Sequence, residues 1–333
     1  MKGRATSYDV ARLAGVSQSA VSRTFKPGAS VSAKTREKVI KAAEDLGYRP
    51  NAIARSLISR RSNMVAVLVS GQLNFYYPEV LFQLTSRFSE EGQRVLLFTI
   101  EQPEDVANAI DQIWQYQVDG VISASHLSVD EHDLLRKRGI PVVMFNRYFA
   151  DHSSTGVWCD PAPALEAMVD DLSSQGHTDF ALLEGPDYSM VSRLRMEAAR
   201  TAIASSGGRV VAATRGDYRY ESASDAVQAI LAQASPTAIV CANDMMAMGA
   251  MDELREVVGL SVPGDISVTG FDGIGAARFA AYELTTIRQP LGRMTDAAVS
   301  LLLGRVENPD VSDERRVLQG TYQPGASTGP AKG

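Results

Sequence analysis

The feature that most constrains this chain is a pair of short helical patterns joined by a tight turn, within residues 6–28. A hydroxyl at Thr6 or Ser7 can cap the first helix, because it accepts a hydrogen bond from a backbone N–H that has no partner inside the helix. Gly15 allows the left-handed backbone of a helix C-cap, and Ser17 can cap the second helix. This spacing predicts a helix-turn-helix, whose second helix can lie in the major groove of DNA. An ordinary pair of packed helices with a solvated polar face is the alternative.

Charge is distributed unevenly along the chain, and this favours the DNA-binding interpretation. Residues 1–62 contain 13 Lys and Arg against 4 Asp and Glu, which gives +9, whereas the remaining residues contain 20 against 35, which gives −15. A basic segment attached to an acidic body is typical of a nucleic-acid-binding domain joined to a domain that does not bind nucleic acid.

A third helical pattern completes the basic segment. It begins after Ser32, carries an apolar stripe and ends at Gly47, so three helices can form a small bundle that displays the second one. Pro50 then opens a short helical pattern over 52–58, which is too short to be stable without DNA or a partner chain.

Beyond residue 62, short apolar runs alternate with helical stretches. This rhythm predicts an α/β fold with parallel sheets covered by helices on both faces, and its length suggests two similar subdomains. The expected strands are 64–69, 95–98, 118–122, 142–145, 180–183, 210–212, 238–241 and 266–268. Ligands bind such folds beyond the carboxyl ends of the strands, so we expect a site in the cleft between the subdomains.

Several short motifs occur together in an order typical of one family of regulators. They are Tyr8-Asp9-Val10-Ala11, Ala14-Gly15-Val16-Ser17, Val21-Ser22-Arg23, Val31-Ser32, Thr35-Arg36, Leu46-Gly47-Tyr48, Pro50-Asn51, Ala54-Arg55 and Leu57. Through them the chain resembles the LacI/GalR family of transcriptional regulators, and the resemblance extends along most of its length. It implies a periplasmic-binding-protein-like body, a homodimer on palindromic double-stranded operator DNA, and repression more than activation.

The resemblance also implies the domain boundaries. The helix-turn-helix domain would take 1–49, the hinge 50–62, and the effector-binding and dimerisation domain 63–325. Within the last, the N-terminal subdomain would comprise 63–159 and 289–319, and the C-terminal subdomain 160–288 and 320–325. Composition predicts a disordered tail over 326–333.

For DNA, the resemblance implies that the second helix reads bases through Gln18, Ser19 and Arg23, which agrees with the pairing of Arg with guanine and Gln with adenine. Further groups would contact or position phosphates: Ser7, Tyr8, Ser22, Thr35 and Asn51. In the hinge, Ala54 would let two helices approach closely, and Leu57 would be an apolar wedge in the minor groove. An ordinary core leucine is the alternative for Leu57.

Polar and aromatic residues that follow expected strands are the candidates for effector binding: Ser70, Phe75, Asn146, Arg147, Arg195, Tyr218, Asn243 and Asp272. The resemblance carries a ligand role onto five of them, Asn146, Arg195, Tyr218, Asn243 and Asp272; capping of loops and helices is the alternative. Planar polar groups suit vicinal hydroxyls and aromatic faces suit a sugar ring, so we expect a carbohydrate. Two arginines in the cleft would favour an acidic or phosphorylated effector; an ion pair of Arg147 with Asp151 or Asp160 is the alternative.

Other features exclude several classes of protein. No apolar run is long enough for a membrane span, no apolar signal core follows Met1, and the two cysteines fit a reducing compartment, so we expect a cytoplasmic protein. The four histidines are scattered, which predicts no metal site and no catalysis, and we expect no cofactor. The alternatives are a sugar-binding transport protein and a nucleotide-dependent transferase. A transport protein would not need the basic helix-turn-helix segment. A transferase would need a Gly-rich phosphate loop, and none follows an expected strand.

Overall fold

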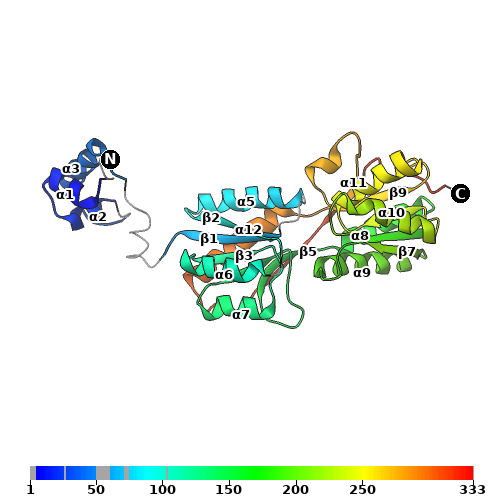
Figure 1. The fold of residues 1–333 in the computed structure, drawn as a ribbon, viewed down its shortest axis with the longest axis horizontal. Helices are drawn as coiled ribbons and strands as arrows, with labels where there is room; N and C mark the ends of the chain where they lie inside the picture. Colours follow the sequence, from blue (N-terminus) through cyan, green and yellow to red (C-terminus); the bar gives the residue numbers. More distant parts are fainter. Residues whose placement is uncertain (1–4, 26–27, 50–60, 71–74, 103, 333) are drawn as a thin grey trace. The chain divides into compact units, whose positions relative to one another are not determined.

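The computed structural model describes residues 5–25, 28–49, 61–70, 75–102 and 104–332 (Figure 1). These residues form two compact units, Met1–Asn63 and Met64–Gly333. Within the described residues, no helix is both long and apolar enough to cross a membrane.

The first unit is a bundle of three helices, α1 (Ser7–Ala14), α2 (Gln18–Thr24) and α3 (Ala33–Asp45). Each begins at a hydroxyl that accepts a hydrogen bond from a backbone N–H: Thr6 for α1, Ser17 for α2 and Ser32 for α3. Gly15 ends α1 in the left-handed conformation, with φ of 65°. Buried Val10, Val21 and Val39 hold the helices together. The predicted helix-turn-helix is therefore confirmed.

The second unit contains two six-stranded sheets (Figure 1). The first sheet has the order β11-β5-β4-β3-β1-β2, and its strands are parallel. Its strands are β1 (Met64–Ser70), β2 (Arg94–Ile100), β3 (Gly120–Ser123), β4 (Val142–Phe145), β5 (Thr155–Asp160) and β11 (Arg315–Gln319). Its helices are α5 (Tyr76–Glu90), α6 (Asp105–Gln115), α7 (Val129–Lys137) and α12 (Leu291–Glu307).

The second sheet has the order β12-β10-β9-β8-β6-β7, with only β12 antiparallel to its neighbour. Its strands are β6 (Asp179–Glu184), β7 (Arg209–Arg215), β8 (Ala238–Cys241), β9 (Ser267–Asp272), β10 (Thr285–Arg288) and β12 (Thr321–Gln323). Its helices are α8 (Ala162–Ser174), α9 (Met190–Ser205), α10 (Ser222–Gln233) and α11 (Asp244–Asp252), followed by a π-helix (Glu253–Val258) and a short 3-10 helix (Gly275–Arg278).

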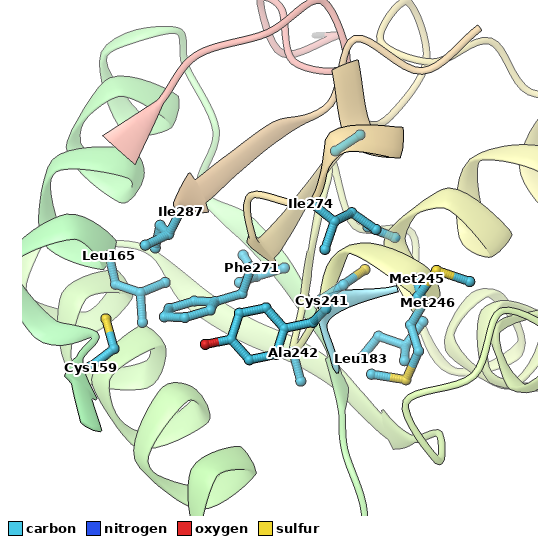
Figure 2. Packing of buried hydrophobic residues seen from close by; sticks show 14 of the residues in the cluster. Cys159, Leu165, Leu183, Cys241, Ala242, Met245, Met246, Phe271, Ile274 and Ile287 are labelled. Carbon is cyan, nitrogen blue, oxygen red and sulfur yellow. The ribbon is translucent and has the colours of Figure 1, made fainter. Parts of the chain in front are cut away.

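On the central strands, alternating side chains are buried on both faces of the sheet. On β1, Val65 and Val67 join one apolar cluster, whereas Ala66 and Leu68 join another. The larger cluster extends from the first sheet into the second, and Figure 2 shows Cys159 of β5 beside Leu165 of α8 at one passage between them. The predicted α/β fold with two parallel-sheet subdomains is confirmed.

The chain passes between the two sheets three times. It leaves the first sheet after β5, returns between β10 and α12, and leaves again between β11 and β12. These passages lie at residues 160–162, 288–291 and 319–321.

The C-terminal segment is ordered against the second sheet, so the prediction of a disordered tail over 326–333 is wrong for the residues described. The Ser327 hydroxyl donates to the Val268 carbonyl over 2.6 Å and accepts from the Thr285 N–H over 2.8 Å. Further along, Ala331 N–H donates to the Gln175 carbonyl over 2.9 Å. The small residues that suggested disorder instead allow close approach, because a Cβ at Gly325 would lie 2.1 Å from the Glu283 carbonyl oxygen.

Candidate functional site

A cavity of about 520 Å³ lies where the strands of both sheets end. From the first subdomain it is lined by Ser70, Tyr76, Tyr77, Ile100, Glu101, Gln102, Val106, Ser125, His126, Asn146 and Arg147. From the second subdomain it is lined by Tyr188, Ser189, Val191, Arg195, Tyr218 and Asp272. Its size and its mixture of aromatic and polar groups suit a small organic ligand.

The strongest electrostatic feature of the cavity wall is a buried ion pair. Arg195 of α9 donates to Asp272 of β9 over 2.8 Å and to the Ala242 carbonyl over 2.7 Å. The guanidinium also stacks 3.8 Å above the Phe271 ring centre. Asp272 accepts a second bond, 2.8 Å long, from the Gln289 side chain. Each charged group is thus paired and held in one orientation.

Burial controls the ionisation of the acidic groups here. Burial raises the pKa of Asp272, against the opposing effects of the Arg195 guanidinium and the Gln289 amide. Behind it, burial and the Asp272 charge raise the pKa of Asp244 to about 8. Asp244 does not line the cavity, and it accepts hydrogen bonds from the Thr286 hydroxyl and the Ile274 N–H, which oppose this rise in pKa. It thereby fixes the backbone two residues beyond Asp272.

Three residues on the wall have left-handed backbone conformations. The φ angles are 54° for Asn146, 69° for Tyr218 and 119° for Asp272. Non-glycine residues adopt such angles at a cost, and they persist where surrounding contacts fix them. Their gathering at one cavity is typical of a functional site.

Tyr218 is fixed on three sides. Its hydroxyl lies 2.7 Å from the Ser189 hydroxyl, and its carbonyl accepts from the Asn243 side chain over 2.9 Å. Its ring packs on Gly185 so closely that a Cβ there would lie 2.6 Å from ring carbons. The aromatic face is consequently presented in a single orientation.

The structure brings six of the eight predicted effector residues together on the cavity wall: Ser70, Asn146, Arg147, Arg195, Tyr218 and Asp272. Asn243 is not on the wall. It is fully buried, and its Oδ1 caps α11 by accepting from Met246 N–H over 3.0 Å. Phe75 is exposed and does not line the cavity either. For Asn243 the capping alternative therefore describes the structure better than the ligand role.

Sequence reasoning missed several wall residues, including Tyr77, Gln102, His126 and Tyr188. Gln102 and His126 follow the ends of β2 and β3, so the rule that found Asn146 after β4 applies to them equally. Tyr77 lies in the first turn of α5 and Tyr188 lies just before α9, so both lie beyond the loops that directly follow a strand.

In the first unit, the side chains of Gln18, Ser19, Ser22 and Arg23 are exposed together along α2. Ser7 is half-buried, at 3.4 Å from the Gln18 amide nitrogen, and Tyr8 is exposed. Thr35 is half-buried and accepts from the Ser32 hydroxyl over 2.8 Å. The predicted residues Asn51, Ala54 and Leu57 lie outside the described residues.

The histidines are less scattered than the sequence suggested. His177 is buried, 2.9 Å from the Thr237 hydroxyl and 2.9 Å from the Gly329 carbonyl oxygen. His132 of α7 and His152 of the loop between β4 and β5 have ring nitrogens 3.3 Å apart. The prediction of four separate histidines is wrong for this pair, because the loop folds back onto α7.

Comparisons with known proteins show to which family the chain belongs. Residues 6–51 match the model for bacterial regulatory proteins of the lacI family, and residues 169–328 match a periplasmic binding protein-like domain. The HTH-type transcriptional regulator AscG of Escherichia coli (strain K12) is 31% identical, with 92% of this chain and 94% of the relative covered. This chain belongs to the LacI family of bacterial regulators. It is a DNA-binding transcriptional regulator and not an enzyme.

Two solved structures share this LacI-family architecture. The lac repressor dimer bound to operator and the anti-inducer ONPF has a TM-score of 0.89 and 28% identity, covering 98% of this chain and 100% of that one. The complex of the transcriptional regulator CelR with cellobiose has a TM-score of 0.75 and 27% identity, covering 97% and 100%. The resemblance to the LacI/GalR family that the sequence motifs indicated is therefore confirmed.

Proposed function

We propose that this LacI-family regulator is a cytoplasmic repressor that binds a palindromic operator as a homodimer and changes its operator affinity when a small carbohydrate occupies the cavity. The observation that carries the proposal is the cavity wall, to which both subdomains contribute convergent polar and aromatic groups. A ligand there contacts both subdomains at once, so its binding can favour one of their arrangements over another.

The DNA-binding part of the proposal rests on α2. Gln18 and Arg23 are exposed on one helix that begins at a capped turn, and their side chains suit the major-groove edges of adenine and guanine. Ser19 completes this base-reading surface on α2. We assign phosphate contacts to Ser7, Tyr8, Ser22, Thr35 and Asn51. Ala54 and Leu57 are assigned to the hinge, on the basis of the family resemblance alone.

A carbohydrate fits the chemistry of the cavity. Arg195 and Asp272 offer a donor fork beside an acceptor, and Tyr218 offers a fixed aromatic face. Hydroxyl pairs on a sugar ring can donate to the carboxylate and accept from the guanidinium, while the ring packs on the tyrosine. The solved structure of the transcriptional regulator CelR is a complex with cellobiose, which supports the same class of ligand.

An acidic or phosphorylated sugar is the second candidate, and Arg147 favours it. Arg147 lines the cavity, and within the described residues it forms no ion pair; its Nε donates to the Ala124 carbonyl over 3.4 Å. A guanidinium without a carboxylate partner is suited to an anionic ligand group. Arg147 thus distinguishes the two candidates.

A thermal-shift screen of neutral sugars, each paired with its phosphate and its uronic acid, tests the effector class. We expect a sugar-containing ligand to raise the melting temperature, and the variant R147Q to lose only the preference for the anionic members. Arg12 provides the matched control, because R12Q removes the same charge from the first unit. Absence of a shift from every sugar tested would contradict the proposal.

DNA binding is tested by gel mobility shift with genomic fragments at several salt concentrations. We expect binding by the dimer that weakens steeply as salt rises, since phosphate contacts release counterions. L57A should reduce affinity for the selected operator more than affinity for unrelated DNA. A sugar-binding transport protein would show no binding in this assay.

A further inference from the structure

Three side chains outside the cavity converge on one point. The Nδ1 atom of His132 lies 3.3 Å from Nε2 of His152 and 3.5 Å from Oδ1 of Asp133, and His152 Nε2 lies 3.0 Å from the same Asp133 oxygen. Each atom can offer an electron pair, and together they form the one such group of His, Cys, Asp and Glu within the part of the chain that the structure describes.

These separations also suit atoms that bind one metal ion. Two of the three exceed the usual N–H···O length of about 3.0 Å, and the third, between His152 and Asp133, equals it. A triangle with these edges has its centre about 1.9 Å from each corner, close to the ~2.1 Å at which imidazole nitrogen and carboxylate oxygen bind Zn²⁺. An ion just outside the plane of the three atoms therefore reaches all of them at tetrahedral geometry.

The chain holds these ligands in place by contacts that do not use the three ligating atoms. A capping box at Ser128 and Glu131 starts α7, which carries His132 and Asp133 on consecutive positions. The loop before β5 is tied down by Arg315, which donates to the carbonyls of Phe149 over 3.0 Å and His152 over 2.9 Å. The His152 ring is thus brought to α7 by its own backbone.

The surroundings of the three ligating atoms contain charges of both signs. Asp133 supplies a negative charge beside the two imidazoles, which bind metals in their neutral form. Arg136 is partly neutralised by Asp313, which lies 3.0 Å away. Asp133 and His152 are partly exposed, which leaves a path for an ion and a water molecule.

We propose that His132 Nδ1, His152 Nε2 and Asp133 Oδ1 bind one divalent transition-metal ion of the Zn²⁺ class, with water in the fourth position. Three protein ligands and one open position are a common arrangement for this ion. Coordination by Nδ1 places a proton on His132 Nε2, which is buried without a hydrogen-bond partner in the described residues. The site should consequently bind about 10- to 100-fold more weakly than one whose outward nitrogen is hydrogen-bonded.

The test uses the full chain without a histidine tag, stripped with EDTA and titrated with Zn²⁺ by calorimetry and with Co²⁺ by visible absorption. We expect one equivalent of Zn²⁺ to bind, and Co²⁺ to develop the d–d bands of tetrahedral coordination. The variants H152Q and D133N, at partly exposed positions, should each weaken binding by about tenfold or more and abolish those bands. Buried His132 is left unchanged so that folding is preserved.

D130N is the matched control, because Asp130 is an exposed carboxylate on the same helix outside the cluster. It should keep the wild-type affinity within about twofold, since a surface charge one turn away contributes little. Far-UV circular dichroism of each variant excludes unfolding as the cause of lost binding. The proposal is overturned if no saturable binding occurs near one equivalent, or if H152Q binds as tightly as the wild type.

Discussion

Arg195 and Asp272 form an ion pair 2.8 Å long whose side chains are only 5% and 3% exposed, at the wall of a cavity that both subdomains line. Burying two charges is unfavourable unless each is paired and hydrogen-bonded. Ala242, Phe271 and Gln289 complete the contacts. The pair is therefore a structural element of the cavity before any ligand arrives.

The ion pair predicts a stability effect that depends on which partner is removed. R195M should lower the free energy of unfolding by about 3–5 kcal/mol, because it leaves the buried Asp272 carboxyl without its cationic partner. The double variant R195M/D272N should recover part of the loss. Urea unfolding followed by tryptophan fluorescence measures this in the second unit, which contains both tryptophans. Equal stability of the two variants would contradict the prediction.

Gly185 should be intolerant of a larger side chain. In G185A the new Cβ would displace the Tyr218 ring, so we expect a loss of about 1–3 kcal/mol and weaker effector binding. G304A is the control, because Gly304 is an exposed residue within α12 and a Cβ there meets nothing within 4 Å. That variant should gain up to about 1 kcal/mol. Thermal unfolding with and without ligand measures both.

The C-terminal segment should contribute to stability through Ser327. S327A removes a buried hydroxyl that joins Val268 to Thr285 and leaves the Thr285 N–H without a partner, which should cost about 1–3 kcal/mol. S174A removes an exposed hydroxyl bonded to the Asp171 carbonyl and should change stability by less than about 0.5 kcal/mol. A disordered tail would give two variants of equal stability, as judged by chemical denaturation.

His177 should make stability fall as the pH drops below neutrality. Burial lowers its pKa in the folded protein, so the unfolded chain takes up a proton first, as the pH falls through about 6.5. The stability gained from burying neutral His177 is fully present above that pH. It is lost as the pH falls towards the lower pKa that His177 has in the folded protein. H177Q loses native hydrogen bonds, but it has no imidazole to protonate and therefore does not carry this penalty. The stability difference between wild type and H177Q should therefore shrink from pH 7 to pH 5 in parallel thermal melts.

Arg23 should determine base preference on DNA. R23A should cost about 1–3 kcal/mol at the operator and relax preference at one base pair, because a bidentate contact to guanine is lost. R12A removes the same charge from α1, where Arg12 pairs with Asp9. It should leave the base preference unchanged. Binding to operators randomised at single positions measures the difference, and identical preferences in both variants would exclude a reading role for Arg23.

Much of the fold follows from local sequence signals. The capped turns of α1 and α2 depend on single residues, Thr6, Gly15 and Ser17, whose preferences are strong. The eight predicted strands are apolar runs with β-branched residues. Among the others, β12 has three residues, β11 begins and ends with exposed Arg315 and Gln319, and β5 and β10 mix threonine and charged residues with apolar ones. Their pairing is decided by the passages between the sheets, which no local window contains.

The site was predictable in part for a similar reason. Strand ends converge in parallel sheets, so Asn146, Tyr218 and Asp272 could be grouped from sequence. Asn243 also follows a strand, but its side chain turns toward the α11 backbone. The pairing of His132 with His152 depends on a loop held by Arg315, which is 163 positions from His152. Contacts over such distances leave no periodic pattern.

Gln289 lies on the second of the three passages between the sheets and is bonded twice to Asp272. Its side chain donates to the Asp272 carboxylate, and its N–H donates to the Asp272 carbonyl over 3.2 Å. Two bodies joined by three short segments retain few directions of relative motion, so bringing them together sacrifices little conformational entropy. A ligand that binds Asp272 contacts a residue that is hydrogen-bonded to Gln289, and so to one of those segments. A sugar bound there shifts the balance between subdomain arrangements by the difference in its affinity for them, and little of that difference is lost to conformational entropy.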